Sequence, residues 1–180
     1  MYSLSLYSAH GALPLADASL VRHRESVAPG RVNRQLVHQA DLLATMADIV
    51  GAALPPTAGE DSVNILPLLE GRDEPVRRSS VSQSMRGLLS IRRQQWKLIL
   101  GPGSGGWAKG RDAQAAQLYD LETDLAETTN LYSQRPRVAA ELTELMATTV
   151  ERGRSTPEAP QTNDVPVRWR RFLDAATKQP

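Results

Sequence analysis

Apolar residues recur with a helical period in two parts of the chain. In the first part they occur every three or four residues, at Val37, Ala40, Leu43, Met46, Ala47 and Val50. This spacing places them on one face of an α-helix, and the glycine that follows is a common helix end. The second stripe, within residues 136–153, begins at a proline and stops at a glycine. The pattern therefore predicts helices over residues 37–50 and 136–153.

Between these helices the pattern changes to that of short strands. Residues 87–91 and 96–100 are apolar-rich runs joined by four polar residues, which is typical of a β-hairpin. One face of the second run is expected to carry Trp96, Leu98 and Leu100. A third strand is expected at residues 118–121. We predict an α+β chain in which the second helix covers one face of a small antiparallel sheet.

The two ends of the chain are less regular. Residues 1–35 show no clear period, and the first twenty lack the basic region and unbroken apolar run of a signal peptide. We expect residues 1–35 to be an irregular or mis-started leader and residues 154–180 to be a proline-containing tail. No apolar run is long enough to predict a membrane span. Three short strands and two helices give a thin core, so we expect the apolar stripes to need a packing partner.

Composition narrows the possible functions. The 180 residues contain 21 basic and 20 acidic side chains, a formal net charge of +1, and this balance argues against nucleic-acid binding. There is no cysteine, which excludes disulfides, thiolate metal sites and cysteine nucleophiles in these residues. Cysteine usage does not reveal the compartment, and localisation stays open.

Several motifs invite a chemical interpretation, and each has a simpler one. The glycine-rich stretch 101–110 follows a strand but lacks the Gly-Lys-Ser/Thr and helix of a phosphate loop. The acidic residues Glu122, Asp124 and Glu127 suggest a calcium loop, but their spacing favours a turn capped by carboxylates.

The histidines lack metal-ligand spacing and are expected to be solvated; they are His10, His23 and His38. Five arginines could meet an anion or simply form a charged surface: Arg77, Arg78, Arg86, Arg92 and Arg93. Residue types and spacing alone therefore predict no catalytic or metal site.

The order of five segments is more specific, because it resembles the C-terminal portion of arylsulfatase-type sulfatases. The segments are QADLLATMADIVG (39–51), EDSVNILPLLEG (60–71), SIRRQQWKLI (90–99), QLYDLETDLAETTNL (117–131), and GRSTP (153–157) with Asn163 and Asp164. The resemblance covers about residues 36–164. Leu125 stands where the family usually has proline, which loosens that turn without threatening the fold.

The resemblance implies an α/β protein with an alkaline-phosphatase-like core. Residues 36–78 would form the end of that catalytic core, and residues 79–153 a C-terminal subdomain of antiparallel sheet and helix. A complete family member hydrolyses small-molecule or glycan sulfate esters with a formylglycine and a calcium ion, and is often periplasmic or secreted. The formylglycine motif and the metal-binding aspartates have no match here. We therefore expect no cofactor, metal or catalytic residue in this chain, and no activity alone.

Two residues are candidates for the rim of a substrate site. Gln83 stands in a segment where sulfatases often carry histidine near the substrate mouth, and Arg86 follows it closely. Ordinary polar positions on an edge strand are an equal interpretation. The alternative function is a non-catalytic module that binds a sulfated glycan or a protein partner. An independent small enzyme is disfavoured, because no acid, base or metal cluster converges.

Overall fold

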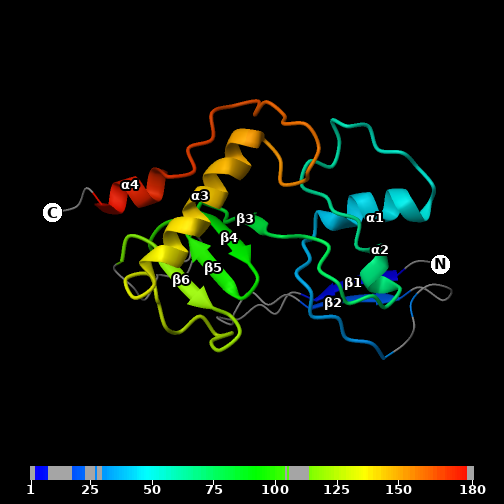
Figure 1. The fold of residues 1–180 in the computed structure, drawn as a ribbon, viewed down its shortest axis with the longest axis horizontal. Coiled ribbons are helices and arrows are strands. Elements are labelled where there is room, and N and C mark those ends of the chain that lie inside the picture. Colours follow the sequence, from blue (N-terminus) through cyan, green and yellow to red (C-terminus); the bar gives the residue numbers. More distant parts are fainter. Residues whose placement is uncertain are drawn as a thin grey trace. The chain divides into compact units, whose positions relative to one another are not determined.

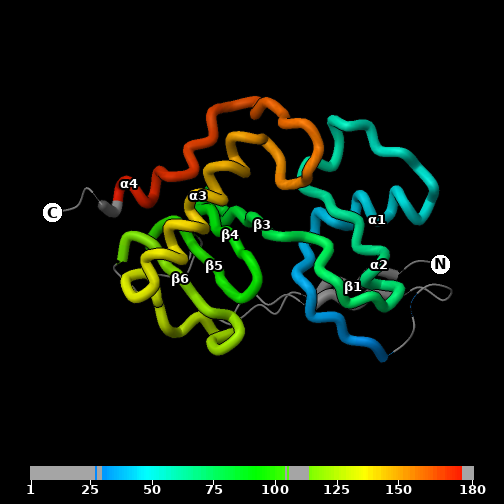
Figure 2. The backbone as a smooth tube through the Cα atoms, in the orientation of Figure 1, coloured from blue at the N-terminus to red at the C-terminus, as the bar shows by residue number. Residues whose placement is uncertain are grey.

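The computed structural model describes residues 3–7, 18–22, 27, 30–103, 105 and 114–177. The chain divides into two compact units (Figures 1 and 2). Unit 1 comprises residues Met1–Arg78 and Ser155–Ala159, and unit 2 comprises Ser79–Arg154 and Pro160–Pro180. No described helix has the length and apolar character needed to cross a membrane.

Unit 1 contains helix α1, Asp41–Ile49, and the one-turn helix α2, Leu66–Leu69. The predicted helix over 37–50 is present, but its expected start at residue 37 was wrong. The Asp41 carboxylate accepts a 2.6 Å hydrogen bond from the backbone N–H of His38, and this contact holds the preceding residues in a turn. The apolar residues at helical spacing therefore start at Val37, before the helix itself begins at Asp41.

Two strands also lie in the segment that we expected to be irregular. Strand β1, Ser3–Tyr7, pairs antiparallel with β2, Ala18–Arg22. Serine and leucine alternate in β1, which is the two-residue period of a strand. The alternation is too short to stand out from the surrounding sequence, so the sequence pattern did not reveal it.

Unit 2 is built on a four-stranded antiparallel sheet in the order β3-β4-β5-β6. The strands are β3 Ser80–Gln83, β4 Leu89–Arg93, β5 Trp96–Ile99 and β6 Gln117–Asp120. The predicted hairpin is confirmed, although its loop is only two residues long, because β4 continues to Arg93. Gln94 in that loop has a φ of 54°, and two-residue hairpin loops require such left-handed backbone. The sequence predicted three strands for this sheet, and the structure adds the edge strand β3 as a fourth.

Helix α3, Pro136–Arg152, lies across one face of this sheet, as the sequence predicted (Figure 1). It ends at Gly153, whose φ of 62° is the left-handed conformation of a helix C-terminus. The core between helix and sheet consists of Leu89, Ile91, Leu98, Leu100, Ala116, Leu118, Ala139, Leu142, Met146 and Leu173. Leu98 and Leu100 are both buried and Trp96 packs against them from the same face, as the alternation predicted.

The C-terminal tail contains a further helix, α4, Arg171–Thr177. From the sequence we expected only a proline-containing tail over residues 154–180. Leu173 contributes to the core of unit 2 and is buried. Packing of this side chain explains why a seven-residue helix forms without a strong periodic signal.

Candidate functional site

Gln83 and Arg86, the expected rim residues, lie on one tight turn of unit 2. Gln83 is the last residue of β3, and the chain then turns back into β4. The Ser84 backbone N–H donates to the Leu88 carbonyl over 2.8 Å, and the Leu88 N–H donates to Ser84 Oγ over 3.0 Å. Both candidate side chains are exposed. The turn therefore exposes one amide side chain and one guanidinium side chain to solvent.

Arg171, the first residue of α4, joins this turn, and no pattern in the sequence pointed to it. Its guanidinium donates to the backbone carbonyl of Arg86. Gly87 makes the approach possible, since a Cβ at that position would lie 2.6 Å from Arg171 Nη2 and 3.4 Å from Gln83 Nε2. The candidate rim thus consists of the turn with Gln83 and Arg86 and of Arg171, whose guanidinium contacts the backbone of that turn; guanidinium groups suit sulfate or carboxylate groups.

The start of the glycine-rich stretch borders the same turn. The Arg86 N–H donates to the Gly105 carbonyl over 3.2 Å. The Gln117 side-chain amide donates to the carbonyls of Gly101 and Gly103, each over 2.8 Å. These contacts use backbone acceptors, whereas a phosphate loop offers backbone donors. The rest of the stretch, residue 104 and residues 106–110, lies outside the described residues.

In unit 1, Arg77 is buried and so is not part of a charged surface. It pairs with the fully buried Asp41 over 2.9 Å and donates to the Asp61 carbonyl over 2.8 Å. Asp41 also accepts a 3.0 Å hydrogen bond from the Val63 N–H. Burial lowers the pKa of Arg77, against the opposing effect of Asp41. The pair therefore ties α1 to the segments that follow it, and this is a structural role.

His38 borders this pair and is half-buried. Its Nδ1 accepts a 3.2 Å hydrogen bond from the Ala40 N–H, which requires that nitrogen to be unprotonated. Burial, followed by the charge of Arg77, lowers the pKa of His38. The expectation of a solvated histidine was therefore wrong for this residue. His10 and His23 lie outside the described residues.

The acidic cluster forms the carboxylate-capped turn that was favoured over a calcium loop. Asp124 accepts hydrogen bonds of 2.8 Å from the backbone N–H groups of Thr128 and Thr129. Desolvation opposes ionisation, but these bonds outweigh it and the pKa of Asp124 is lowered. Glu127 pairs instead with Lys97 over 2.6 Å, and both side chains are largely buried. The carboxylates of Asp124 and Glu127 are therefore already engaged by protein groups.

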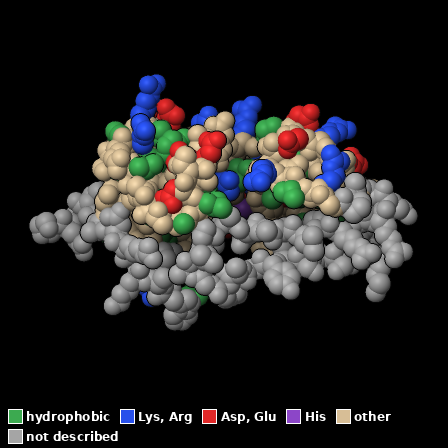
Figure 3. Space-filling view, turned by 90° about the horizontal axis from the view of Figure 1, so that it is seen from below, with side chains coloured by type: hydrophobic (Ala, Val, Ile, Leu, Met, Phe, Trp, Pro, Cys, Tyr) green, Lys and Arg blue, Asp and Glu red, His purple; other side chains and the backbone are tan. Residues whose placement is uncertain are grey.

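The described residues do not fit the calcium site of a sulfatase. In that part of the chain, no three His, Cys, Asp or Glu side chains are grouped so that they could hold a metal ion. The sequence also has no cysteine for a formylglycine. Basic and acidic side chains are intermingled on the described residues of the face in Figure 3. The described residues of this face form no basic stripe of the kind that binds nucleic acid.

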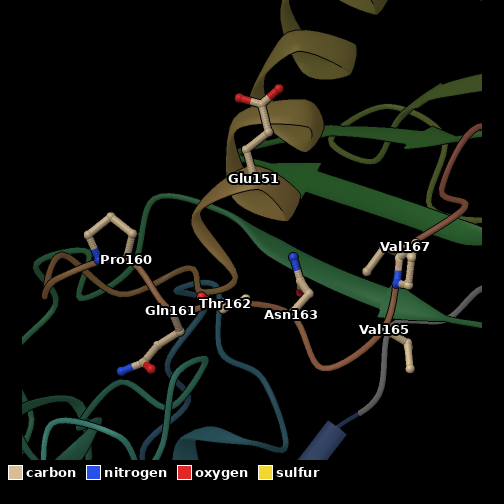
Figure 4. A pocket seen from close by; sticks show the side chains of 8 residues that line it. Glu151, Pro160, Gln161, Thr162, Asn163, Val165 and Val167 are labelled. Atoms are coloured by element: carbon tan, nitrogen blue, oxygen red, sulfur yellow. The ribbon is translucent and has the colours of Figure 1, made fainter.

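The C-terminal tail also shapes a shallow pocket of about 500 Å³ in unit 2 (Figure 4). The Gln161 N–H donates to the Arg152 carbonyl over 2.8 Å, and Asn163 Nδ2 donates to the Val150 carbonyl over 2.7 Å. These bonds fold the tail back onto the end of α3. The remaining lining includes Glu151, Val165 and Val167, so the pocket brings together no acid–base pair.

Comparison by sequence and comparison by structure both find sulfatases. No protein-family model matches the chain. The chain is 34% identical over 148 residues to the N-acetylgalactosamine-6-O-sulfatase of Bacteroides thetaiotaomicron, covering 79% of this chain and 28% of that relative. The chain therefore spans little more than a quarter of the length of this relative.

Two solved structures share the fold. One comes from work on the metabolism of multiple glycosaminoglycans by Bacteroides thetaiotaomicron; it has a TM-score of 0.62 and 31% identity, over 73% of this chain and 28% of that chain. The other is a complex with its substrate D-glucosamine-2-N,6-O-disulfate; it has a TM-score of 0.57 and 19% identity, over 73% of this chain and 27% of that chain. The expected resemblance is thereby confirmed. The chain belongs to the sulfatase family and represents the C-terminal part of a sulfatase with an alkaline-phosphatase-like fold.

Proposed function

We propose that the protein to which this chain corresponds hydrolyses a sulfate ester on a glycan, with a 6-O-sulfated N-acetylhexosamine as the first candidate. The observation that carries the proposal is the 34% identity over 148 residues to an N-acetylgalactosamine-6-O-sulfatase. The non-catalytic binding module is not favoured, because the relatives found by sequence and by fold are sulfatases or act on sulfated sugars.

The part that this chain plays is substrate positioning. Gln83 and Arg86 are exposed on a turn that hydrogen bonds hold at both ends. A guanidinium binds sulfate oxygens through two parallel N–H groups, and a side-chain amide can donate to a sugar oxygen. The cluster contains no nucleophile and no general base. We therefore assign it to the rim of the substrate site and not to the reacting centre.

The chain by itself is proposed to be inactive toward sulfate esters. The sequence has no cysteine and no Ser-x-Pro/Ala-x-Arg from which a formylglycine could be made. The described residues also lack a group that could hold the calcium ion. Catalysis therefore depends on residues that this chain does not contain.

A chimera tests this proposal directly. The matching quarter of the Bacteroides N-acetylgalactosamine-6-O-sulfatase is replaced by this chain, and sulfate release from N-acetylgalactosamine-6-sulfate is measured by ion chromatography. We expect release by the chimera and none by the purified 180-residue chain. A folded chimera that releases no sulfate, or a purified chain that does, would contradict the proposal.

Point variants then separate a rim role from a structural one. Replacing Arg86 by alanine in the chimera is expected to raise KM about tenfold, the usual cost of losing a charged hydrogen bond. The matched control is Arg137→Ala, since Arg137 is also exposed in unit 2 but lies on α3 and makes none of the contacts of the turn. Equal KM values for the two variants would remove Arg86 from the rim.

A further inference from the structure

A second groove of unit 2 lies between α3 and the start of α4, and its lining shares no residue with the candidate rim. It has a volume of about 580 Å³, within the range of small-molecule sites. Its lining includes Tyr132, Ala140, Thr143, Glu144, Trp169 and Arg170. The groove thus brings aromatic, small and polar side chains together.

Aromatic side chains are concentrated at this groove. The part of the chain whose side chains the structure describes has five aromatic residues, and two of them, Tyr132 and Trp169, line the groove. Both also pack against the core of unit 2, and the Tyr132 N–H donates to Asn130 Oδ1 over 3.0 Å. Their positions are therefore held before any ligand arrives, which reduces the entropic cost of binding.

On the α3 side, the groove is lined by small side chains and by polar ones. Ala139, Ala140 and Ala147 leave space above the helix, while Thr143 and Glu144 supply oxygen atoms. The Thr143 hydroxyl donates its proton to the Ala139 carbonyl over 2.7 Å, so its oxygen remains an acceptor. No interaction within the described residues engages the Glu144 carboxylate. These oxygens can accept hydrogen bonds from several hydroxyl groups of one ligand.

A guanidinium completes the lining on the α4 side. The Arg170 Cζ lies 5.4 Å from the centre of the Trp169 ring, a cation–π arrangement. Arg170 also pairs with Asp174 over 3.5 Å, and both side chains are about half exposed. An exposed pair of this kind is weak. The guanidinium can therefore turn toward an anionic group in the groove at little cost.

We propose that this groove binds a saccharide unit that carries a sulfate group. The apolar face of a sugar ring would lie against Trp169 or Tyr132, its hydroxyl groups would donate to Thr143 and Glu144, and Arg170 would receive the sulfate. A lipid or an apolar helix fits less well, because it would leave these polar groups unpaired. The choice of sulfate as the anion rests on the proposed function, whereas the choice of a sugar rests on the lining.

Binding to the full chain tests the proposal without requiring catalysis. Isothermal titration uses a tetrasaccharide containing 6-O-sulfated N-acetylgalactosamine, and its unsulfated counterpart. We expect Arg170→Gln to weaken binding of the sulfated sugar about tenfold and to leave the unsulfated sugar unaffected. The matched control is Arg137→Gln, which removes the same charge from an exposed position on α3 outside the groove. Equal losses in both variants would indicate non-specific charge attraction and overturn the proposal.

A second variant blocks the groove without removing a charge. Ala140 is exposed on α3 and lines the groove, whereas Thr148 is exposed on α3 and does not. We expect Ala140→Trp to abolish binding of both sugars and Thr148→Trp to leave binding intact. Undiminished binding by a folded Ala140→Trp chain would overturn the proposal. If the chimera releases no sulfate but the variants change sugar binding as expected, the result contradicts the proposed function and leaves the proposal for the groove intact.

Discussion

The Arg77 guanidinium lies 2.9 Å from the Asp41 carboxylate, and both side chains are almost completely removed from solvent. Asp41 is satisfied by two backbone N–H groups as well, those of His38 and Val63. The Nε of Arg77 is buried without a hydrogen-bond partner among the described residues. The pair thus joins the start of α1 to the end of the first segment of unit 1, and one buried donor stays unsatisfied.

Removing one partner of this pair should destabilise unit 1 strongly. Arg77→Ala leaves the Asp41 carboxylate buried without its cation, and we expect a loss of about 3–5 kcal/mol in the free energy of unfolding. Urea unfolding followed by far-UV circular dichroism measures it. The neighbouring Arg78 is exposed, so Arg78→Ala should change stability by less than about 0.5 kcal/mol. Similar losses for the two variants would refute a special role of the pair.

The lowered pKa of His38 predicts a stability that falls with decreasing pH. In the unfolded chain the histidine takes up a proton near its ordinary pKa of about 6.5. In the folded chain burial and Arg77 resist protonation, and the Nδ1 hydrogen bond from Ala40 requires the neutral ring. The unfolded state therefore binds more protons in this window, so stability is complete above about pH 6.5 and declines below it.

The free energy of unfolding is measured at about pH 7.5 and at about pH 5.5. Most carboxylates titrate below this range, so they contribute little to the difference between the two values. The variant His38→Gln keeps a side-chain acceptor but cannot titrate. We expect it to flatten the pH dependence of stability within the window. An unchanged slope in this variant would assign the effect to other groups.

The elements that the sequence predicted are those with a clear period. The helix over 136–153 and the hairpin around Gln94 each follow from the spacing of apolar residues and from their end signals. Strand β3, with the sequence SVSQ, has a single large apolar residue and is therefore invisible to a periodic pattern. Helix α4 depends on the packing of Leu173 in the core, which only the folded chain reveals.

The candidate rim was even harder to predict from the sequence than these elements. Gln83 is a candidate only through the family resemblance, and residue type alone places Arg86 among five arginines without separating it from the other four. Arg171 was missed because it reaches the turn only through folding of the tail and the absence of a side chain at Gly87. A buried pair such as Arg77 with Asp41 is likewise a product of tertiary contact, because neither residue lies near the other in sequence.

Two methionines of this chain allow a direct comparison of buried and exposed positions. Met146 on α3 is fully buried in the core of unit 2, while Met46 on α1 has 37% of its surface exposed. Met146→Ala should cost about 2–5 kcal/mol of unfolding free energy, because it removes packed atoms and leaves a cavity. Met46→Ala should cost less than about 1 kcal/mol. Equal costs would mean that the face of α1 is covered in solution.

One face formed by α1 and the residue that follows it, Val50, carries apolar side chains that are exposed within unit 1. Leu43 is 50% exposed and Val50 is 70% exposed. Clustered exposed apolar groups mark contact surfaces, and the chain spans 28% of its sulfatase relative. We therefore predict that this face packs against the remainder of a sulfatase fold. The double variant Leu43→Gln/Val50→Gln should leave the stability of the chain within about 0.5 kcal/mol, yet lower the folded yield of the chimera.

The measurement is the soluble, monodisperse yield of each chimera by size-exclusion chromatography, beside urea unfolding of the chain alone. Arg137→Gln, on exposed α3 surface, serves as the control and should affect neither quantity. The 180-residue chain should also self-associate at high concentration, and the double variant should remove that association, because apolar faces left uncovered attract one another. A chimera that tolerates both glutamines in full yield would show that α1 faces solvent in the complete fold.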